Sequence, residues 1–221
     1  MICQSRPRWK PGKVSHGRYL LRMVDLNDRV ADLGSMATLH RYRVFETAHG
    51  VAAIAWSGDA ITAFRLPGET AREAEWSLLR RLPDAVAGDP PPAIAAVIAD
   101  AVRYFAGEPV DFDAVAIDLG EQEPFFARVY DRVRAIGRGE TMTYGAVARE
   151  LGAGPEAARA VGQAMARNPI PLIVPCHRVL AAGSRVHGFS APGGALAKVR
   201  MLEIEGVATE PPPAAQTAFE F

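Results

Sequence analysis

The sequence predicts an α/β segment over residues 36–118, followed by a mainly α segment over residues 119–207 that contains a helix-turn-helix pair. Short runs of β-forming residues with hairpin signals fill the start of the first segment. Apolar residues at helical spacing recur from there onward. The charge balance also changes along the chain: residues 36–120 carry seven basic and twelve acidic side chains, whereas residues 151–200 carry six basic and one acidic. Such an asymmetry suggests that the second segment can meet an anion.

The composition is that of an ordinary globular chain. Its 221 residues include 25 basic and 25 acidic side chains, 49% hydrophobic residues and two cysteines, which excludes a disulfide scaffold. The longest apolar stretch, AIAAVIADAV, is too short to span a membrane and is broken by Asp100. The N-terminal residues MICQSRPRWKPGK lack the apolar core of a secretory signal. We therefore expect a cytoplasmic protein without a membrane partner.

Both ends of the chain are expected to lack a packed structure. Residues 1–35 follow no sustained period, and residues 1–22 carry six basic and no acidic side chains. We expect this segment to be a disordered basic extension, with Met36 as the hypothetical true start, which N-terminal sequencing would test. The proline-rich residues 208–221 are expected to form a disordered tail.

Strands and two helices are expected in the α/β segment. The strands are VFETA, GVAAIAWS and AITAFRL, with a hairpin turn at Gly58 and Asp59 between the last two. ETAREAEWSLLRRLP has helical spacing and stops at Pro83, and AIAAVIADAVRYFAGE follows the DPPPA run as a second helix. DFDAVAIDLG is predicted as a further strand. The domain boundary is placed near residues 115–123, where the charge changes sign.

The mainly α segment begins with the amphipathic helix PFFARVYDRVRAIGRG. Two short helices follow, joined by Gly152, Ala153 and Gly154, with Thr143 placed to cap the first and Pro155 at the start of the second. This arrangement is typical of a helix-turn-helix pair.

The second helix of this pair is rich in small residues, among them Ala157, Ala158 and Gly162, and Arg159 is its main long side chain in the first turns. Small residues let a helix approach another surface closely. That surface is either the core of the protein, which is the commoner case for helical hairpins, or a DNA groove, where the helix N-terminus would face phosphate. Composition alone leaves both interpretations open.

The run NPIPLIVPCHRVL contains the residues best suited to chemistry. Its three prolines exclude a helix and predict an extended approach to Cys176. A thiol is a nucleophile only as a thiolate, and His177 and Arg178 are groups that lower a thiol pKa. Since neighbours in an extended chain point to opposite faces, Cys176 and His177 would communicate through a water or a helix end. The alternative is an inert, buried cysteine, as we expect for Cys3.

Together these motifs resemble the O6-alkylguanine-DNA alkyltransferases, also called methylated-DNA–protein-cysteine methyltransferases. The resemblance spans about residues 121–207 and is carried by PCHRV after RNPIPLIV, by TYGAVARELG and AARAVGQAMARNP upstream, and by GFSAPGG and KVRMLEIEG downstream. It implies a ribonuclease-H-like α/β domain over residues 36–118 and a C-terminal domain with a winged-helix-like helix-turn-helix over residues 119–207.

The resemblance also implies a suicidal repair reaction. A monomer binds double-stranded DNA, rotates an O6-alkylguanine out of the base stack, and moves the methyl or other alkyl group irreversibly to its own cysteine. O4-alkylthymine is a second candidate substrate. No metal and no organic cofactor is implied.

Four residues carry the catalytic roles that the resemblance implies. Cys176 is the alkyl acceptor, and His177 is the base that activates it through a bridging water. Glu205 orients the imidazole, and Tyr144 donates a hydrogen bond toward the purine ring nitrogen. Without the resemblance, Glu205 would be interpreted as a surface carboxylate of a helix.

The implied DNA contacts and substrate pocket lie around the helix-turn-helix pair and the cysteine. Arg159 is implied to enter the minor groove and fill the vacated stack, with Ala157, Ala158 and Thr143 in the same interface. The implied pocket consists of Asn168, which ties the helix to the active-site loop, together with Pro171, Val179, Phe189 and Ser190. The family often has tyrosine where this chain has Phe189, and APGG lengthens the following loop.

Two other classes of function compete with this interpretation. A non-catalytic DNA-binding relative would keep the helix-turn-helix pair and replace the reactive cysteine, so the presence of Cys176 argues against it. A Cys-His hydrolase needs an oxyanion hole and a base in direct reach, which the adjacent Cys176 and His177 fit poorly.

Overall fold

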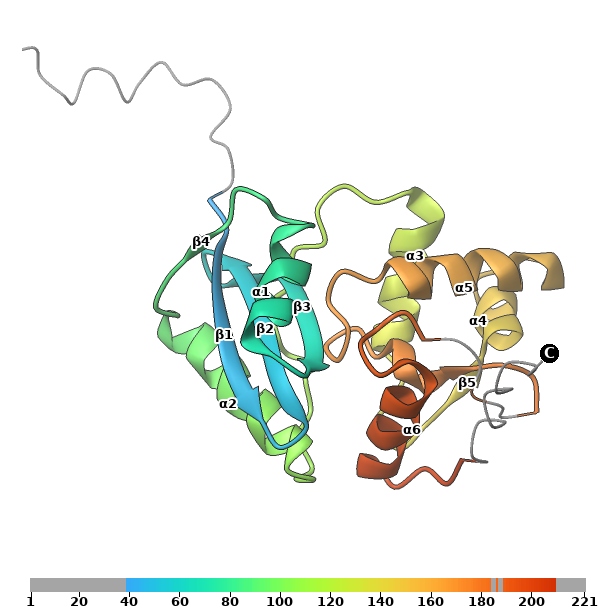
Figure 1. Ribbon diagram of the computed structural model, residues 1–221. Helices are drawn as coiled ribbons and strands as arrows, with labels where there is room; N and C mark the ends of the chain where they lie inside the picture. Colours follow the sequence, from blue (N-terminus) through green and yellow to red (C-terminus); the bar gives the residue numbers. More distant parts are fainter. Residues whose placement is uncertain (1–38, 184–185, 187–188, 210–221) are drawn as a thin grey trace, which may run out of the picture. The chain divides into compact units, whose positions relative to one another are not determined.

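The fold is known from a computed structural model that describes residues 39–183, 186 and 189–209 (Figure 1). The expected extension over residues 1–35, the hypothetical start at Met36 and all but two residues of the expected tail lie outside the described residues. Within the described ranges, no helix combines the length and the apolar character needed to cross a membrane.

The predicted strands form a four-stranded sheet. β1 (Arg41–Thr47), β2 (Gly50–Ser57) and β3 (Ala60–Gly68) pair antiparallel in the order of the sequence. The hairpin turn at Gly58 and Asp59 is confirmed, and Gly58 adopts a φ of +56° that suits glycine. The short β4 (Val86–Ala87) pairs in parallel with β1 and was not expected, because two residues are too few to show a period.

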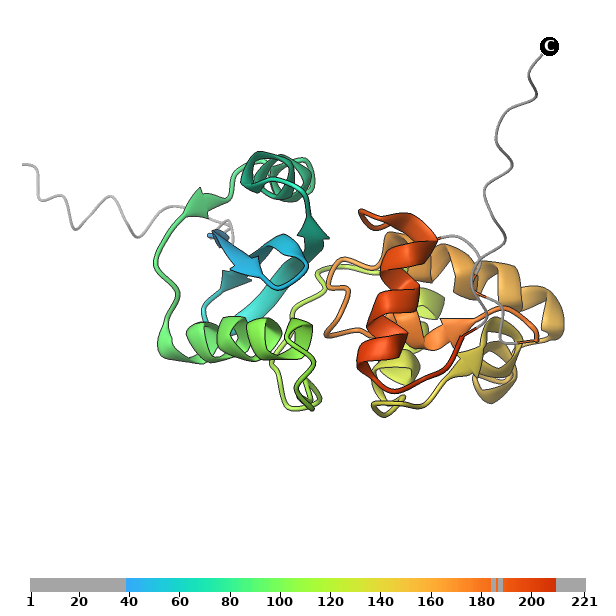
Figure 2. The ribbon, with the colours of Figure 1, turned by 60° about the horizontal axis from the view of Figure 1, so that its bottom comes forward.

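One helix covers each face of this sheet (Figure 2). Successive residues of a strand point to opposite faces, so β2 contributes to two separate hydrophobic clusters. Ala53 and Ala55 pack against α1 (Ala71–Leu79), whereas Ile54 lies in the cluster that contains α2 (Pro92–Phe105). Thr70 caps α1 by accepting a hydrogen bond from a backbone N–H of the first turn.

The strand predicted for DFDAVAIDLG is wrong except at a single position. Only Ile117 forms a β-bridge, with Ile61 of β3. Asp111 and Asp118 instead accept hydrogen bonds from the backbone N–H two residues further along the chain. Such local turns compete with a strand ladder, because they use the backbone groups that the ladder would need.

The second half of the chain is mainly helical, as predicted. In a parallel two-stranded pair, β5 (Met142–Thr143) pairs with β6 (Val179–Leu180), which follows Cys176. The remaining elements, in chain order, are α3 (Pro124–Arg134), α4 (Tyr144–Glu150), the 3₁₀ helix η1 (Pro155–Ala157), α5 (Ala158–Arg167), the 3₁₀ helix η2 (Cys176–Arg178) and α6 (Gly194–Ile204).

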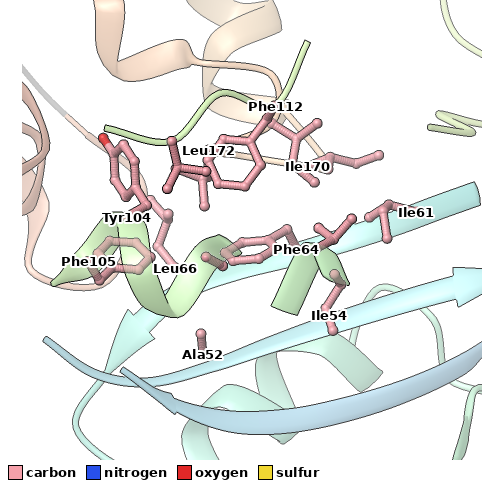
Figure 3. Packing of buried hydrophobic residues seen from close by; sticks show 14 of the residues in the cluster. Ala52, Ile54, Ile61, Phe64, Leu66, Tyr104, Phe105, Phe112, Ile170 and Leu172 are labelled. Atoms are coloured by element: carbon pink, nitrogen blue, oxygen red, sulfur yellow. The ribbon is translucent and has the colours of Figure 1, made fainter. Parts of the chain in front are cut away.

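A shared hydrophobic cluster joins the two halves. It combines residues of the sheet and α2 with Ile170 and Leu172, which precede the cysteine (Figure 3). The carbonyl of Pro169 also accepts a hydrogen bond of 3.0 Å from the backbone N–H of Phe64 in β3. The segment that leads to the cysteine is therefore held against the sheet. All described residues belong to one compact unit, and the boundary between residues 118 and 119 stays a prediction.

Candidate functional site

Cys176 lies at the start of a 3₁₀ turn, so the expected extended approach does not continue through it. The N–H of Arg178 donates to the carbonyl of Pro175 at 2.9 Å, which closes the turn. Leu172, four residues before the cysteine, adopts a φ of +80°, a conformation that is strained for a leucine. Cys176 is 4% exposed and lines a cavity of about 510 Å³.

Asn168 connects the end of α5 to the chain that precedes the cysteine. Its Nδ2 donates to the carbonyl of Val174 at 2.8 Å, and its Oδ1 accepts from the N–H of Ile170 at 3.0 Å. Both bonds are buried, and Asn168 also lines the cavity. The asparagine therefore holds the cysteine segment in register with the helix, the arrangement that the resemblance implies.

His177 and Glu205 form a buried hydrogen-bonded pair. The imidazole Nε2 lies 2.7 Å from Glu205 Oε1, and both side chains are fully buried. Burial lowers the pKa of His177, although the nearby carboxylate raises it in part, so the ring is neutral. Because a carboxylate accepts, Nε2 carries the proton and Nδ1 is left as an acceptor. Nδ1 is buried and has no hydrogen-bond partner among the described residues.

Glu205 is not a surface carboxylate, since only 7% of the residue is exposed. Arg178 donates to both of its oxygens, from Nε at 2.9 Å and from Nη2 at 3.0 Å. Burial alone would raise the pKa of Glu205, but the hydrogen bonds from His177 and Arg178 outweigh it and leave that pKa well below its usual range. The carboxylate is therefore an anion at neutral pH. From its place in the sequence, Arg178 was expected to lower the pKa of Cys176. The structure shows its guanidinium bonded to Glu205 instead.

Tyr104 is a member of this network that the sequence did not reveal. It lies on α2, and its hydroxyl donates to Glu205 Oε1 at 2.9 Å. Burial raises the pKa of Tyr104, which keeps the hydroxyl protonated. In Figure 3 this hydroxyl lies at the edge of the hydrophobic cluster. A tyrosine on the apolar face of a buried helix needs a partner for its hydroxyl, but sequence alone does not say which one.

Lys198 is the second residue that was missed. It lies on α6, is 1% exposed, and donates from Nζ to the carbonyl of Val179 at 2.6 Å. The ammonium lies 5.7 Å from the ring centre of Tyr144 and 5.8 Å from that of Phe189. Burial lowers the pKa of Lys198 to about 8. A single lysine in an amphipathic helix is usually a surface residue, so no sequence pattern marked it.

The electrostatics favour a neutral thiol at rest. Burial raises the pKa of Cys176, and this effect outweighs the hydrogen bond from Asn168 and the positive charge of Lys198, both of which lower it. A buried thiol becomes a good nucleophile only when a base removes its proton. His177, with its free Nδ1, is the neighbour in the chain that has an acceptor available.

Four of the predicted pocket residues line the cavity that contains Cys176. They are Asn168, Pro171, Phe189 and Ser190. The Ser190 hydroxyl donates to the carbonyl of Ala166 on α5 at 3.2 Å. Val179 does not line this cavity and is instead fully buried in the cluster that contains Cys176.

Tyr144 is the first residue of α4 and also lies outside the lining of the cavity. Thr143 caps α4, because its Oγ1 accepts from the N–H of Ala146 at 3.1 Å, as expected. The pairing of β5 with β6 places Thr143 opposite Leu180, and Tyr144 packs against the hydrophobic cluster that contains Cys176.

The small residues of α5 divide between two surroundings. Val161, Ala164 and Met165 are buried against α3 and α4, which is the packing that the commoner interpretation expects. A Cβ added to Gly162 would meet nothing within 4 Å, and Arg159 is exposed. Internal packing therefore explains one face of α5 but requires no glycine at position 162.

Within the described ranges, no group of three or more His, Cys, Asp or Glu residues is arranged to hold a metal ion. The residues around Cys176 offer a thiol, an imidazole acceptor and hydrogen-bond donors, which together suit nucleophilic attack on an electrophilic carbon.

Comparisons with known proteins agree on one family. Residues 124–207 match the family described as 6-O-methylguanine DNA methyltransferase, DNA binding domain. The methylated-DNA–protein-cysteine methyltransferase of Methanothermobacter thermautotrophicus is 36% identical over 158 residues, which are 71% of this chain and 80% of that protein. The enzyme of the same name from Mycobacterium tuberculosis strain H37Rv is 38% identical over 164 residues, 74% of this chain and 91% of that protein.

A solved structure shows the same similarity in three dimensions. The crystal structure of Mycobacterium tuberculosis OGT in complex with DNA has a TM-score of 0.61 to this chain, with 34% sequence identity. The similarity covers 75% of this chain and 92% of that one. It therefore extends beyond the matched family domain into the first half of the chain.

Proposed function

Because this chain belongs to the methylated-DNA–protein-cysteine methyltransferase family, we propose that Cys176 is the residue to which its repair reaction transfers the alkyl group. The reaction is direct reversal of DNA damage, a single irreversible transfer of a methyl or other alkyl group from O6 of guanine in double-stranded DNA to the protein. One observation carries the assignment to Cys176: its thiol lines a cavity, and the next residue is a neutral imidazole held by a buried carboxylate.

The transfer needs one proton to leave the thiol and one to reach the guanine. His177 Nδ1 takes the thiol proton through a bridging water, and the resulting imidazolium is stabilised by Glu205, to which Nε2 is bonded. The Cys176 sulfur then attacks the alkyl carbon, so that the sulfur–carbon bond forms as the bond from carbon to O6 breaks. Burial raises the pKa of Tyr144, so its hydroxyl stays protonated and donates a hydrogen bond to the purine ring nitrogen of the departing guanine. The guanine takes up its one proton from water, and the imidazolium returns its proton to water.

The α4–α5 pair is proposed as the helix-turn-helix that contacts DNA. Arg159 is exposed at the start of α5, where its guanidinium can enter the minor groove and occupy the space that a flipped guanine leaves. Ala157, Ala158 and the open position at Gly162 allow the helix to approach the duplex closely. Thr143 supports this interface indirectly, because it caps α4.

The wider organisation of the chain is proposed on the same basis. The antiparallel β1–β3 hairpins with α1 and α2 on opposite faces fit a ribonuclease-H-like domain over residues 36–118. Residues 119–207 would then form the DNA-binding and transfer domain, of which residues 124–207 match the family description. We also propose that the protein acts as a monomer in the cytoplasm.

Intact-protein mass spectrometry tests the assignment of the acceptor. The protein is mixed with a duplex that contains one O6-methylguanine, and the adduct is located by peptide mapping. We expect the mass to rise by one methyl group per protein, on Cys176, without turnover. The Cys176→Ser variant should gain nothing and still bind the duplex, since a serine hydroxyl stays protonated at neutral pH. A methyl group found on another residue, or equal transfer by the serine variant, would contradict the assignment.

A further inference from the structure

Four arginines line the cavity that contains Cys176. Arg65 comes from β3, Arg80 and Arg81 follow the last turn of α1, and Arg167 ends α5. Among the residues that the structure describes, no aspartate or glutamate lines this cavity. A strong positive charge is therefore concentrated beside the cysteine.

Three of these arginines belong to the acidic part of the chain. Residues 36–120 carry only seven basic side chains against twelve acidic ones, yet Arg65, Arg80 and Arg81 line the same cavity. They also lie outside residues 124–207, the part that matches a DNA-binding domain. These three arginines therefore cluster at the cavity although the segment that contains them has a net negative charge.

Two other arginines of the first half have carboxylate partners in the structure. Arg43 pairs with Asp89 at 3.1 Å, and Arg103 pairs with Asp100 at 3.0 Å and with Glu108 at 2.8 Å. Among the described residues, none of the four cavity arginines forms an ion pair. Their charge is therefore not neutralised within the part of the chain that the structure describes.

The contacts of these arginines hold them at the cavity without cancelling their charge. Arg65 donates from Nε to the carbonyl of Ser77 at 3.1 Å, and Arg81 donates from Nη1 to the carbonyl of Arg167 at 3.5 Å. Arg80 lies 4.9 Å over the ring of Trp76. Burial lowers the pKa of Arg65 to about 10, which still leaves it protonated at neutral pH. Unpaired guanidinium groups bind phosphate oxygens strongly, often through two parallel hydrogen bonds.

We propose that Arg80 and Arg81, supported by Arg65, bind the backbone phosphates of the DNA strand whose nucleotide enters the cavity. The α/β half of the chain is then part of the DNA-binding surface. This inference rests on the proposed function, because it assumes that a nucleotide of duplex DNA reaches Cys176. Its partner is the sugar-phosphate backbone, so it adds affinity without sequence preference.

The test compares two double variants that remove the same charge from the same half of the chain. Arg80→Gln with Arg81→Gln removes the two exposed cavity arginines that follow α1, and Arg43→Gln with Arg103→Gln removes two exposed arginines that have carboxylate partners. Fluorescence anisotropy measures binding to an unmodified duplex at several salt concentrations. Each lost phosphate contact should reduce the slope of log affinity against log salt by about 0.9, which for two contacts predicts roughly 60-fold weaker binding at about 0.1 M salt.

The control variant, Arg43→Gln with Arg103→Gln, should bind the duplex with wild-type affinity and an unchanged slope of log affinity against log salt. Transfer from free O6-benzylguanine, which has no phosphate, should fall far less in the cavity variant than transfer from duplex DNA. A cavity variant with wild-type affinity and slope would overturn the proposal, and so would equal losses on free base and duplex, which would indicate a damaged pocket. Methylation of wild-type Cys176 is read separately by mass, so failure of the proposed function is distinguishable from failure of this inference.

Discussion

Replacing Glu205 with glutamine tests the buried network behind the cysteine. The carboxylate accepts two hydrogen bonds from Arg178 at 2.9 and 3.0 Å, one from His177 at 2.7 Å and one from Tyr104 at 2.9 Å. Glutamine has nearly the same shape, but its amide nitrogen is a donor and meets other donors. The substitution also leaves the buried Arg178 without its carboxylate partner.

The expected cost follows from the burial of this pair. Removing one partner of a buried ion pair costs about 3–5 kcal/mol, because the remaining charge has lost both water and its counter-ion. For a chain of this size, each kcal/mol lowers the melting temperature by about 2–4 °C, so a fall of roughly 6–20 °C is expected. Glu203→Gln is the matched control, because Glu203 is exposed in the last turn of α6, whose C-cap is Glu205, and it should change stability by less than about 0.5 kcal/mol.

The pH dependence gives a second measurement of the same effect. The folded-state pKa of Glu205 lies well below its ordinary value of 4.5, because bonds from His177 and Arg178 outweigh the effect of burial. A lowered carboxyl pKa contributes stability that is present above the unfolded-state pKa and is lost as pH falls through the folded-state pKa. The difference between wild type and Glu205→Gln should therefore be full near neutral pH and shrink below about pH 4.5.

Urea denaturation followed by circular dichroism, from neutral to acidic pH, measures both quantities. A loss of unfolding free energy below about 1 kcal/mol at neutral pH would refute the reasoning, since ion pairs of that strength are typical of the exposed surface. A difference that stays constant into acid would equally contradict the lowered pKa.

Three further predictions concern neighbouring parts of the site. Tyr104→Phe should cost about 1.5–3 kcal/mol of stability and change the pH profile of methyl transfer, because it removes a hydrogen bond to a buried carboxylate. The control, Tyr42→Phe, removes the hydrogen bond from Tyr42 to Glu75 and should leave that pH profile unchanged. Identical pH profiles for both variants would contradict the role of Tyr104. The pKa of Lys198 falls from an ordinary 10.5 to about 8 on folding, so the unfolded state binds more protons between these two pH values and the free energy of unfolding should rise with pH there. Lys198→Met should abolish that rise, as measured by urea titrations at several pH values. The same dependence of stability on pH in the variant would count against the buried ammonium. Arg159→Ala should weaken transfer from duplex DNA far more than transfer from free O6-benzylguanine, and equal losses in the two rate assays would remove its role in base flipping.

Much of the fold could be predicted because its signals are local. The hairpin strands, the two helices on the sheet and the α4–α5 pair appear near the predicted positions, since period, caps and turn residues lie within a few positions of each other. The strand predicted for DFDAVAIDLG fails for a local reason too, because its aspartates bond to nearby backbone groups. β4, β5 and β6 could not be predicted, because two-residue strands exist only where a distant partner pairs with them.

The candidate site divides in the same way. The sequence by itself determined that Cys176, His177 and Arg178 are adjacent, that Thr143 caps a helix and that Arg159 protrudes from a helix of small residues. These facts depend on neighbours in the chain, so pattern and resemblance were sufficient to find them.

Only the tertiary structure decided what surrounds these residues. In the folded chain Glu205 is a buried anion, and Tyr104, which is 101 residues away in the sequence, donates a hydrogen bond to it. The same packing gathered arginines of β3, α1 and α5 around one cavity. Burial and electrostatics depend on which distant groups exclude water and supply charge, and chain folding alone brings those groups together.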